Sequence, residues 1–392
     1  FFKKSPVSDL RHTQFHIFML VFIFSLAGAT LSTHLALCWV FLEATTLSSA
    51  YLIYFERTSS SLEAAWKYMF ICSIGIALAF VGIILLSIGH ASGHSLFFKD
   101  LYHQAAEMDI FWLKLSFTFI LIGLGTKMGL APVHAWLPDA HSESPSPVSA
   151  LLSGTLLNTA LLGIIRFNHL LRIAGIENWG RVLLYLMGFL SLLISAAYIL
   201  TSRHYKRMLA YSSIENMGII AICLATGPTA LWALMLQIVS HSMAKASLFL
   251  TSGTLYLHYK SKEIEGVHGI CRRLPATGWI WILSFLALAG IPPSPIFYSE
   301  FQLVKALFQN EHIGMAILFL FTLTVILYGM GRNILAMAGG GSSATDRPES
   351  GSWTSILPQI ILLTGLLILG LLMPDRINTI LQQAADYPGG QP

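Results

Sequence analysis

Long apolar segments recur along almost the whole chain, and they constrain its fold more than any other feature. A helix needs about 20 apolar residues to cross a bilayer core roughly 30 Å thick. In lipid, only helices and closed barrels satisfy all their backbone hydrogen bonds, so each segment is predicted to be a transmembrane helix. About eleven spans are expected, at residues 15–32, 35–54, 62–88, 111–131, 148–167, 182–200, 208–225, 230–258, 279–308, 314–337 and 356–373.

The composition agrees with a membrane protein and excludes a water-soluble enzyme. Hydrophobic residues make up 55% of the 392 residues and charged residues only 11%, whereas soluble domains carry roughly 25% charged residues. Mean hydropathy is +0.68. The Lys and Arg residues form no basic stripe with interleaved aromatic residues, so no nucleic-acid partner is expected. We predict an all-α polytopic protein in which residues 1–392 form a single membrane domain surrounded by lipid.

The cysteines argue against a redox centre in this chain. The four cysteines are single and far apart, with no CxxC pair, so they provide neither a disulfide framework nor ligands for an iron–sulfur cluster. No cofactor is expected. Any electron transfer coupled to this chain would take place in a partner subunit.

The distribution of basic residues predicts how the chain is oriented in the membrane. Thirteen Lys and Arg residues fall on the side of the N-terminus and seven on the opposite side, when the spans alternate. Cytoplasmic loops carry the excess of positive charge, so the N-terminus is predicted to be cytoplasmic and the C-terminus external. The thirteen are Lys3, Lys4, Arg11, Arg57, Arg203, Lys206, Arg207, Lys260, Lys262, Arg272, Arg273, Arg332 and Arg347; the seven are Lys99, Lys114, Arg166, Arg172, Arg181, Lys305 and Arg376.

Two spans are interrupted in the same way. The fourth contains Gly-Leu-Ala-Pro up to Pro132, and the ninth contains Gly-Ile-Pro-Pro with Pro292 and Pro293. Proline breaks the helical hydrogen-bond ladder, and in lipid such breaks survive where protein or water satisfies the freed groups. The breaks lie five spans apart, which predicts two inverted five-helix repeats. Repeat one covers about 12–170 and repeat two about 180–338, followed by one C-terminal helix at about 352–380.

Ionisable residues inside the first repeat mark a candidate functional site. Glu43 lies centrally in the second span and Lys127 lies in the fourth span, just before its break. Such residues cost at least ~2.5–3.5 kcal/mol each at bilayer depth, so they need a partner, a water-filled cavity or a function. A carboxylate and an ammonium that separate and rejoin can take up and release a proton. The alternative is a structural ion pair between helices.

The second repeat extends this polar row. His241 and Lys245 lie four residues apart on one helix face, and Glu300 follows the second break. Histidine, and lysine when desolvated, can exchange protons near neutral pH. For His241 an interhelical hydrogen bond is an equal alternative. Lys67 could instead extend its side chain to the membrane surface, and Glu215 in the seventh span is a comparable supporting candidate.

A polar loop at residues 134–143 contains the residue types of a metal site. Its two His, Asp and Glu residues match no compact metal-binding spacing such as HExxH. The prolines that punctuate it favour a segment that satisfies broken backbone and begins the next helix. No metal is expected.

Several motifs resemble the antiporter-like membrane subunits of respiratory complex I and its relatives. The longest is GTKMGLAPVHAWLPDA at 125–140, continued by SPVSALL at 146–152. LEATTLSS at 42–49, LEAAWKY at 62–68, KRMLAYSSIENMG at 206–218 and HSMAK at 241–245 extend the match. The sequence looks closest to component F of hydrogenase-4, a member of this proton-conducting transporter family found in the membrane arm of group 4 nickel–iron hydrogenases.

The resemblance implies a fourteen-helix fold in which the spans here are helices four to fourteen, so it predicts that the first three helices of the family are missing. It also implies roles. Glu43 and Lys127 are the coupled pair with Lys67 as modulator, Lys245 with His241 is the central relay, and Glu300 is the exit group. Asn158 departs from the pattern, because certain relatives place a lysine there. Asparagine does not titrate, so water or another side chain would have to link the two halves.

The function so implied is proton translocation driven by electron transfer in partner subunits. The expected partners are other membrane-arm subunits, including antiporter-like paralogues, and a soluble hydrogenase or dehydrogenase arm with iron–sulfur subunits. The expected location is the inner membrane of a prokaryote. An Mrp-type cation/proton antiporter subunit and a structural membrane scaffold are the alternatives.

Overall fold

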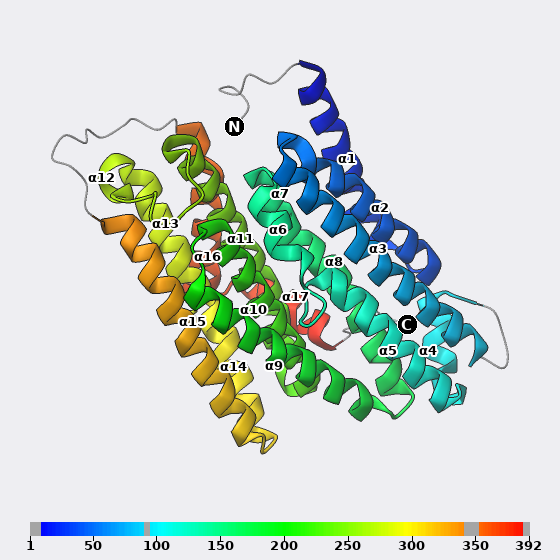
Figure 1. The fold of residues 1–392 in the computed structure, drawn as a ribbon. Helices are drawn as coiled ribbons and strands as arrows, with labels where there is room; N and C mark the ends of the chain where they lie inside the picture. The colour runs from blue at the N-terminus through cyan, green and yellow to red at the C-terminus, as the bar shows by residue number, and fades with distance from the viewer. Residues whose placement is uncertain (1–8, 90–94, 341–352, 387–392) are drawn as a thin grey trace.

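The computed structural model describes residues 9–89, 95–340 and 353–386, which are almost entirely helical (Figure 1). The membrane-length helices of the first half are α1 (Asp9–Leu31), α2 (Leu35–Ile53), α3 (Ser59–Ile88), α5 (Ile110–Met128) and α8 (Leu157–Ile173). Those of the second half are α9 (Glu177–Thr201), α10 (Tyr205–Thr226), α11 (Leu231–Tyr259) and α15 (Ile313–Gly339), followed by α16 (Trp353–Leu371). The shorter helices are α4 (Phe98–Gln104), α6 (Trp136–Glu143), α7 (Ser146–Leu151), α12 (Ile270–Arg273), α13 (Pro275–Leu288), α14 (Pro295–Gln309) and α17 (Asp375–Asp386).

The predicted all-α polytopic architecture is confirmed. In the described ranges, ten helices are long and apolar enough to cross a membrane, and α13 is a shorter apolar helix. The predicted ninth span consists of two half-length helices, α13 and α14, on either side of the break. The fifth span begins as α7 and contains a π-helical turn, Leu152–Leu156, before α8. Lys3, Lys4 and Arg347, used above for the orientation, lie outside the described residues.

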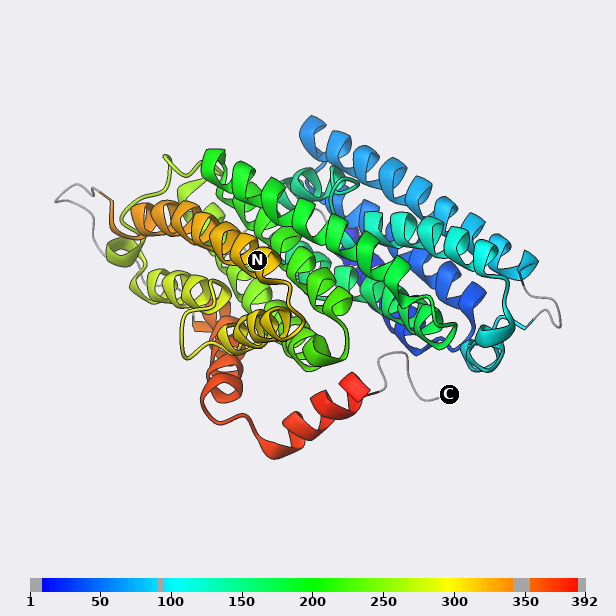
Figure 2. The same ribbon diagram turned by 90° about the horizontal axis from the view of Figure 1, so that it is seen from below.

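Some elements have no counterpart among the predicted spans. The helices α4, α12 and α17 are too short or too polar to resemble a membrane span. The last of these, α17, turns away from α16 at the edge of the bundle (Figure 2). It contacts the start of α11, where Trp232 Nε1 donates a hydrogen bond to Asn378 Oδ1 at 3.0 Å. The hydrophobicity criterion that finds transmembrane helices therefore misses the helices that do not span.

The helix α10 forms the centre of the protein. Every residue from 208 to 226 is buried, although the segment contains charged and amide side chains. By contrast, α1 and α15 expose large apolar side chains, such as Phe24 at 67% and Phe321 at 64%. Such a surface suits lipid and not water. Polar side chains are thus concentrated in the interior, which is where the sequence predicts a site.

The two predicted repeats share a backbone feature at the start of their second helix. His34 precedes α2 and forms an isolated antiparallel bridge with Phe97, and His204 precedes α10 and forms one with Glu263. The five membrane crossings made by α2, α3, α5, α8 and α9 separate the two sites, so they lie at opposite ends of the bundle. This match supports the inverted arrangement, while the repeat boundaries remain a prediction.

Both breaks also have the same local geometry. Gly129 (φ +79°) ends α5 and Gly290 (φ +62°) follows α13, and both lie in the left-handed region that glycine adopts without strain. In each case the next residue donates its backbone N–H to the carbonyl five residues earlier: Leu130 to Gly125 at 2.9 Å, and Ile291 to Leu286 at 3.1 Å. The helices therefore end in the same hydrogen-bonded cap.

A side chain donates a hydrogen bond to one backbone carbonyl at each break. Trp136 Nε1 donates to the carbonyl of Thr126 at 2.7 Å, and Ser294 Oγ donates to the carbonyl of Ala287 at 2.6 Å. Unsatisfied backbone groups are costly in lipid, so these bonds explain how the interruptions predicted at Pro132 and at Pro292–Pro293 are tolerated.

Candidate functional site

Lys127 is fully buried at the end of α5 and contacts α2. Its Nζ donates to the backbone carbonyl of Leu42 at 2.7 Å and to the hydroxyl of Thr46. A neutral amine keeps two N–H donors, which equals the number of acceptors here. This pair of acceptors, which we call the first lysine seat, can therefore hold the side chain in either protonation state.

Glu43 lies next to this seat without contacting the ammonium. Its Oε1 accepts a hydrogen bond from Ser73 Oγ at 2.8 Å, and its buried Oε2 has no hydrogen-bond partner in the described structure. No ion pair joins Glu43 to Lys127 among the described residues. Glu43 and Lys127, the predicted acid–base pair, are thus neighbours on α2 and α5 but form no ion pair in this structure.

Lys245 is fully buried in α11 and has an equivalent arrangement on α10. Its Nζ donates to the backbone carbonyl of Leu209 at 2.6 Å and to the hydroxyl of Ser212. We call these two acceptors the second lysine seat. Each predicted repeat therefore holds one buried lysine on a carbonyl and a hydroxyl of a neighbouring helix.

Two buried histidines occupy the region around Lys245. His241 lies one turn away on α11, and neither of its ring nitrogens has a hydrogen-bond partner in the described structure. His141 of α6 is also fully buried, and its ring stacks on Phe249 with centroids 4.7 Å apart. The backbone of Ser153, in the π-helical turn, lies next to the His241 ring, so proton relay and an interhelical hydrogen bond both stay predictions for this residue. In the sequence, His141 is one residue of the polar loop at 134–143, and nothing there indicates its burial.

Glu215 and Glu300 line one cavity. Glu215 is 7% exposed on α10, and Glu300 lies on α14 just after the second break. The cavity measures about 190 Å³, and mostly apolar side chains of α13, α15 and Ala289 form the rest of its wall, with Thr324 as the one further polar residue that lines it. A water needs about 10–15 Å³ of such space, so several waters fit between the two carboxyl groups.

An uncharged polar chain runs beside this cavity and was not predicted. Ser299 Oγ donates to Gln237 Oε1, and Gln237 Nε2 donates to Asn216 Oδ1 at 2.8 Å. These three buried residues join α14, α11 and α10. Uncharged polar residues within apolar spans give a weak sequence signal, because Ser, Asn and Gln also occur as interhelical hydrogen-bonding residues.

Around Asn158, uncharged hydrogen-bonding groups join the two halves. Asn158 of α8 donates to Ser242 Oγ of α11 at 2.8 Å and to the carbonyl of Gly154 at 2.9 Å. Ser153 and Ser213 form a second contact at 2.8 Å between their hydroxyl oxygens. Ser153 and Gly154 belong to the π-helical turn at residues 152–156, where the ordinary helical ladder is interrupted. Asn158 lies just after this turn.

Lys67 is separate from the buried row. Its side chain is 47% exposed and pairs with Glu63 at 2.6 Å and with Asp139 at 3.2 Å. Asp139 also pairs with Arg207 at 3.1 Å. Exposed ion pairs of this kind contribute little to stability. The structure thus places Lys67 in a surface network.

Lys206 is buried, which corrects its predicted position. The sequence predicts it among the basic residues outside the spans, yet its side chain is 4% exposed. Its Nζ donates to the carbonyl of Ser144 at 3.1 Å. Lys206 is the second residue of α10, the most buried helix, but it lies before the predicted span at 208–225, where the sequence gives no sign of burial.

The residues of the polar loop do not gather around a common point. Asp139 pairs with two cations at the surface, as described above. Glu143 accepts from Lys262 Nζ at 2.8 Å and from Ser60 Oγ at 3.0 Å. In the described ranges, no three His, Cys, Asp or Glu side chains lie close enough together to hold a metal ion.

Comparison with known proteins confirms the family resemblance. The model of the family "NADH:quinone oxidoreductase/Mrp antiporter, TM" matches residues 32–326, which covers α2 to α14 and both lysine seats. The chain is 38% identical over 304 residues to the Hydrogenase-4 component F homolog of Methylacidiphilum infernorum (isolate V4), and the match covers 76% of this chain and 64% of that protein.

A second relative and a solved structure extend the comparison. Hydrogenase-4 component B of Escherichia coli (strain K12) is 28% identical over 309 residues, which cover 76% of this chain and 45% of that protein. The chain thus spans less than two thirds of the length of either relative. The fold is similar to a chain of the membrane-bound sulfane sulfur reductase, an archaeal respiratory membrane complex. The TM-score is 0.91 at 23% identity, with 99% of this chain and 78% of that chain covered.

Proposed function

Because the chain belongs to the NADH:quinone oxidoreductase/Mrp antiporter family, we propose that it is a proton-translocating, antiporter-like subunit in the membrane arm of a complex I-like redox complex. Electron transfer in partner subunits would drive the movement of charge along the buried row. The row consists of Glu43, Lys127, Lys245 and Glu300, with His241 and Glu215 in support.

The observation that carries this proposal is the pair of buried lysine seats. A lysine held by a backbone carbonyl and a hydroxyl has no counterion within its seat, and burial disfavours its charged form. A charge that moves nearby can therefore decide whether the lysine is protonated. A permanent salt bridge would lack this property, since both partners would stay ionised.

The partners follow from the relatives and remain part of the proposal. One relative is named as a hydrogenase-4 component, so a nickel–iron hydrogenase arm with iron–sulfur subunits, or an NADH-oxidising arm, would supply the electrons. Antiporter-like paralogues would be neighbours in the membrane. The relatives from Methylacidiphilum infernorum and Escherichia coli support an inner-membrane location in a prokaryote, and the excess of Lys and Arg on the N-terminal side supports a cytoplasmic N-terminus.

The test is replacement of each seated lysine in the assembled complex. We expect Lys127→Ala and Lys245→Ala each to lower proton translocation into inverted vesicles at least tenfold. The carbonyl of Leu42 also accepts from Thr45 Oγ1 at 2.6 Å, and that of Leu209 accepts from Ser212 Oγ at 3.0 Å. In each variant, the carbonyl that the lysine contacted keeps another hydrogen-bond donor, so assembly should be normal.

Lys305→Ala is the control, because this lysine of α14 is exposed. Unchanged proton translocation in both seat variants, with normal assembly, would leave only the scaffold function.

An Mrp-type antiporter subunit is the second candidate, since the family description includes Mrp antiporters. Sodium-dependent proton exchange in vesicles that contain no hydrogenase or dehydrogenase subunit would favour it. Proton movement that requires an electron donor would favour the first proposal.

A further inference from the structure

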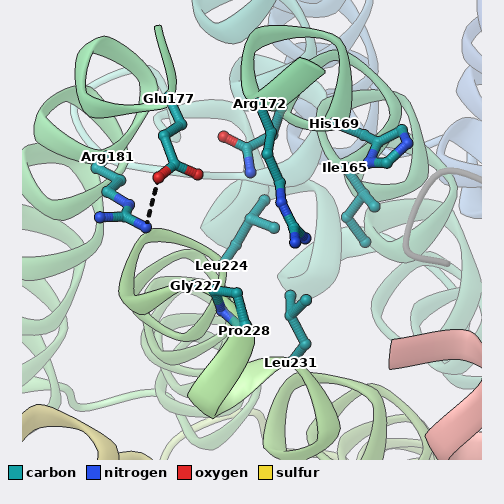
Figure 3. Close-up of a pocket in the computed structure, with 10 residues that line it drawn as sticks. Ile165, His169, Arg172, Glu177, Arg181, Leu224, Gly227, Pro228 and Leu231 are labelled. Atoms are coloured by element: carbon teal, nitrogen blue, oxygen red, sulfur yellow. Dashed lines mark ion pairs between the residues drawn. The ribbon is translucent and has the colours of Figure 1, made fainter. Parts of the chain in front are cut away.

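A polar cleft lies at one end of the bundle, where α8 and α10 end and α9 and α11 begin (Figure 3). Apolar side chains of Ile165, Leu224 and Leu231 form its walls. The turn at Gly227–Pro228 separates it from a wider hollow of about 390 Å³, which Tyr185, Asn310 and His312 also line. Neither space includes any residue of the buried row.

Two arginines supply the charge of this cleft. Arg181 lies between the cleft and the hollow and pairs with Glu177 at 3.0 Å. Arg172 is exposed, and its guanidinium makes no ion pair or hydrogen bond with any described residue. Its guanidinium points into the space between Leu224 and Leu231 (Figure 3). With one carboxylate for two guanidinium groups, the cleft has an excess of positive charge.

Two further polar groups in the cleft have no partner. Oδ1 of Asn168 and Nδ1 of His169 are buried, and neither makes a hydrogen bond in the described structure. Buried polar atoms normally find a partner, and an exception calls for an explanation such as an absent ligand. The imidazole nitrogen donates in the tautomer that carries its hydrogen there, and the amide donates when it is turned. The side chains of Asn168 and His169 can therefore each donate a hydrogen bond to an acceptor in the cleft.

The cleft is close to the boundary between lipid and water. Trp179, two residues after Glu177, is 41% exposed and donates from Nε1 to Thr118 at 3.3 Å. The ammonium of Lys114 lies over the same ring, 5.6 Å from its centroid. A tryptophan next to a lysine at a helix end is typical of the headgroup level of a bilayer.

We propose that this cleft binds a phosphate oxyanion, and that its source is the headgroup of an anionic phospholipid. Arginine forms paired hydrogen bonds with phosphate oxygens, and Arg172 has its donors free for this contact. The apolar walls beside it can hold the start of an acyl chain, while the adjoining hollow has room for the rest of a glycerol headgroup. A soluble phosphate would share the arginine contacts and gain nothing from the walls.

The experiment measures lipid binding to the protein purified from its membrane. Native mass spectrometry would follow titration with diacyl phosphatidylglycerol and, in parallel, with phosphatidylcholine. We expect at least a tenfold preference for phosphatidylglycerol, and at least a fivefold loss of that affinity in Arg172→Gln. Arg172→Lys keeps the charge and should lose less than Arg172→Gln. Lys305→Gln removes an exposed cation elsewhere and should have no effect.

A third titration separates the two sources of phosphate. Displacement of the lipid only by another anionic lipid supports the headgroup, and displacement by millimolar inorganic phosphate supports a site for the free anion with the same arginine chemistry. Equal binding of both lipids, or unchanged binding in Arg172→Gln of normal melting temperature, would overturn the proposal. The measurement involves no proton translocation, so its failure is distinct from failure of the proposed function.

Discussion

The Nζ of Lys245 on α11 hydrogen-bonds the backbone carbonyl of Leu209 on α10 at 2.6 Å. In the other half of the protein, Lys127 makes the same kind of bond to Leu42 at 2.7 Å. A backbone carbonyl cannot be protonated and keeps its position whatever the charge of the lysine. Each seat therefore provides a fixed acceptor against which a proton can be gained or lost.

The hydroxyl groups of the two seats should tune transfer without being essential for it. Thr46→Val and Ser212→Ala each remove one acceptor from a buried lysine and leave the carbonyl. The loss of one such hydrogen bond is worth about 1 kcal/mol, which corresponds to about fivefold in rate. We expect proton translocation to fall by about that factor. Ser48→Ala, on the same helix as Thr46, removes a hydroxyl that bonds only to its own helix backbone and should change nothing.

Gly290 should be required for the position of Glu300. An added Cβ at Gly290 would lie 2.5 Å from Glu300 Oε2, so Gly290→Ala must displace the carboxyl group. Gly175 is the matched control, because it also has a positive φ (+72°) but faces open space. Both variants should lose about 1–2 kcal/mol of stability from the strained backbone. Only Gly290→Ala should lower proton translocation about tenfold, and equal activity of the two would show that Glu300 need not be held there.

The polar chain through Gln237 should contribute to stability. Ser299→Ala removes the donor to Gln237 Oε1 and leaves a buried acceptor unsatisfied, at a cost of about 1–3 kcal/mol. The expected result is a lower melting temperature in detergent. Thr324→Ala serves as control, since its exposed hydroxyl bonds only to the carbonyl of Leu320. Equal melting temperatures for the two variants would contradict a stabilising role of the chain.

The ion pair between Glu143 and Lys262 predicts a pH-dependent contribution to stability. Burial raises the pKa of the Glu143 carboxyl, but the hydrogen bond and charge of Lys262 outweigh this effect, so the pKa lies below its ordinary value of 4.5. A carboxyl group whose pKa is lower in the folded than in the unfolded protein stabilises the fold at pH values above the pKa of the unfolded state. This contribution is lost as pH falls through the folded pKa.

Lys262→Gln should therefore melt at a lower temperature than the wild type at neutral pH, by the equivalent of about 1 kcal/mol or less. The difference should shrink below about pH 4.5. Lys260→Gln removes an exposed cation two residues away and should show no such trend. A difference that is independent of pH between 3 and 7 would exclude this pair as its cause.

Much of the fold could be predicted because each transmembrane helix is encoded locally. Length and hydrophobicity alone identify a span, and proline with glycine identifies a break. Glu43, Lys127, Lys245 and Glu300 were found for the same reason, since an ionisable residue inside an apolar segment is conspicuous. These conclusions needed no knowledge of which helices are neighbours.

The tertiary structure decided what each of these residues contacts. The packing of α5 against α2 decides that Lys127 contacts Leu42 and not the carboxylate of Glu43. The burial of Lys206 and His141 likewise depends on how α10 and α6 pack within the bundle. Their side chains meet groups that are far away in the sequence, and the sequence pattern within one helix contains no information about those groups. The sequence thus determined which residues are costly to bury, and only packing determined how that cost is met.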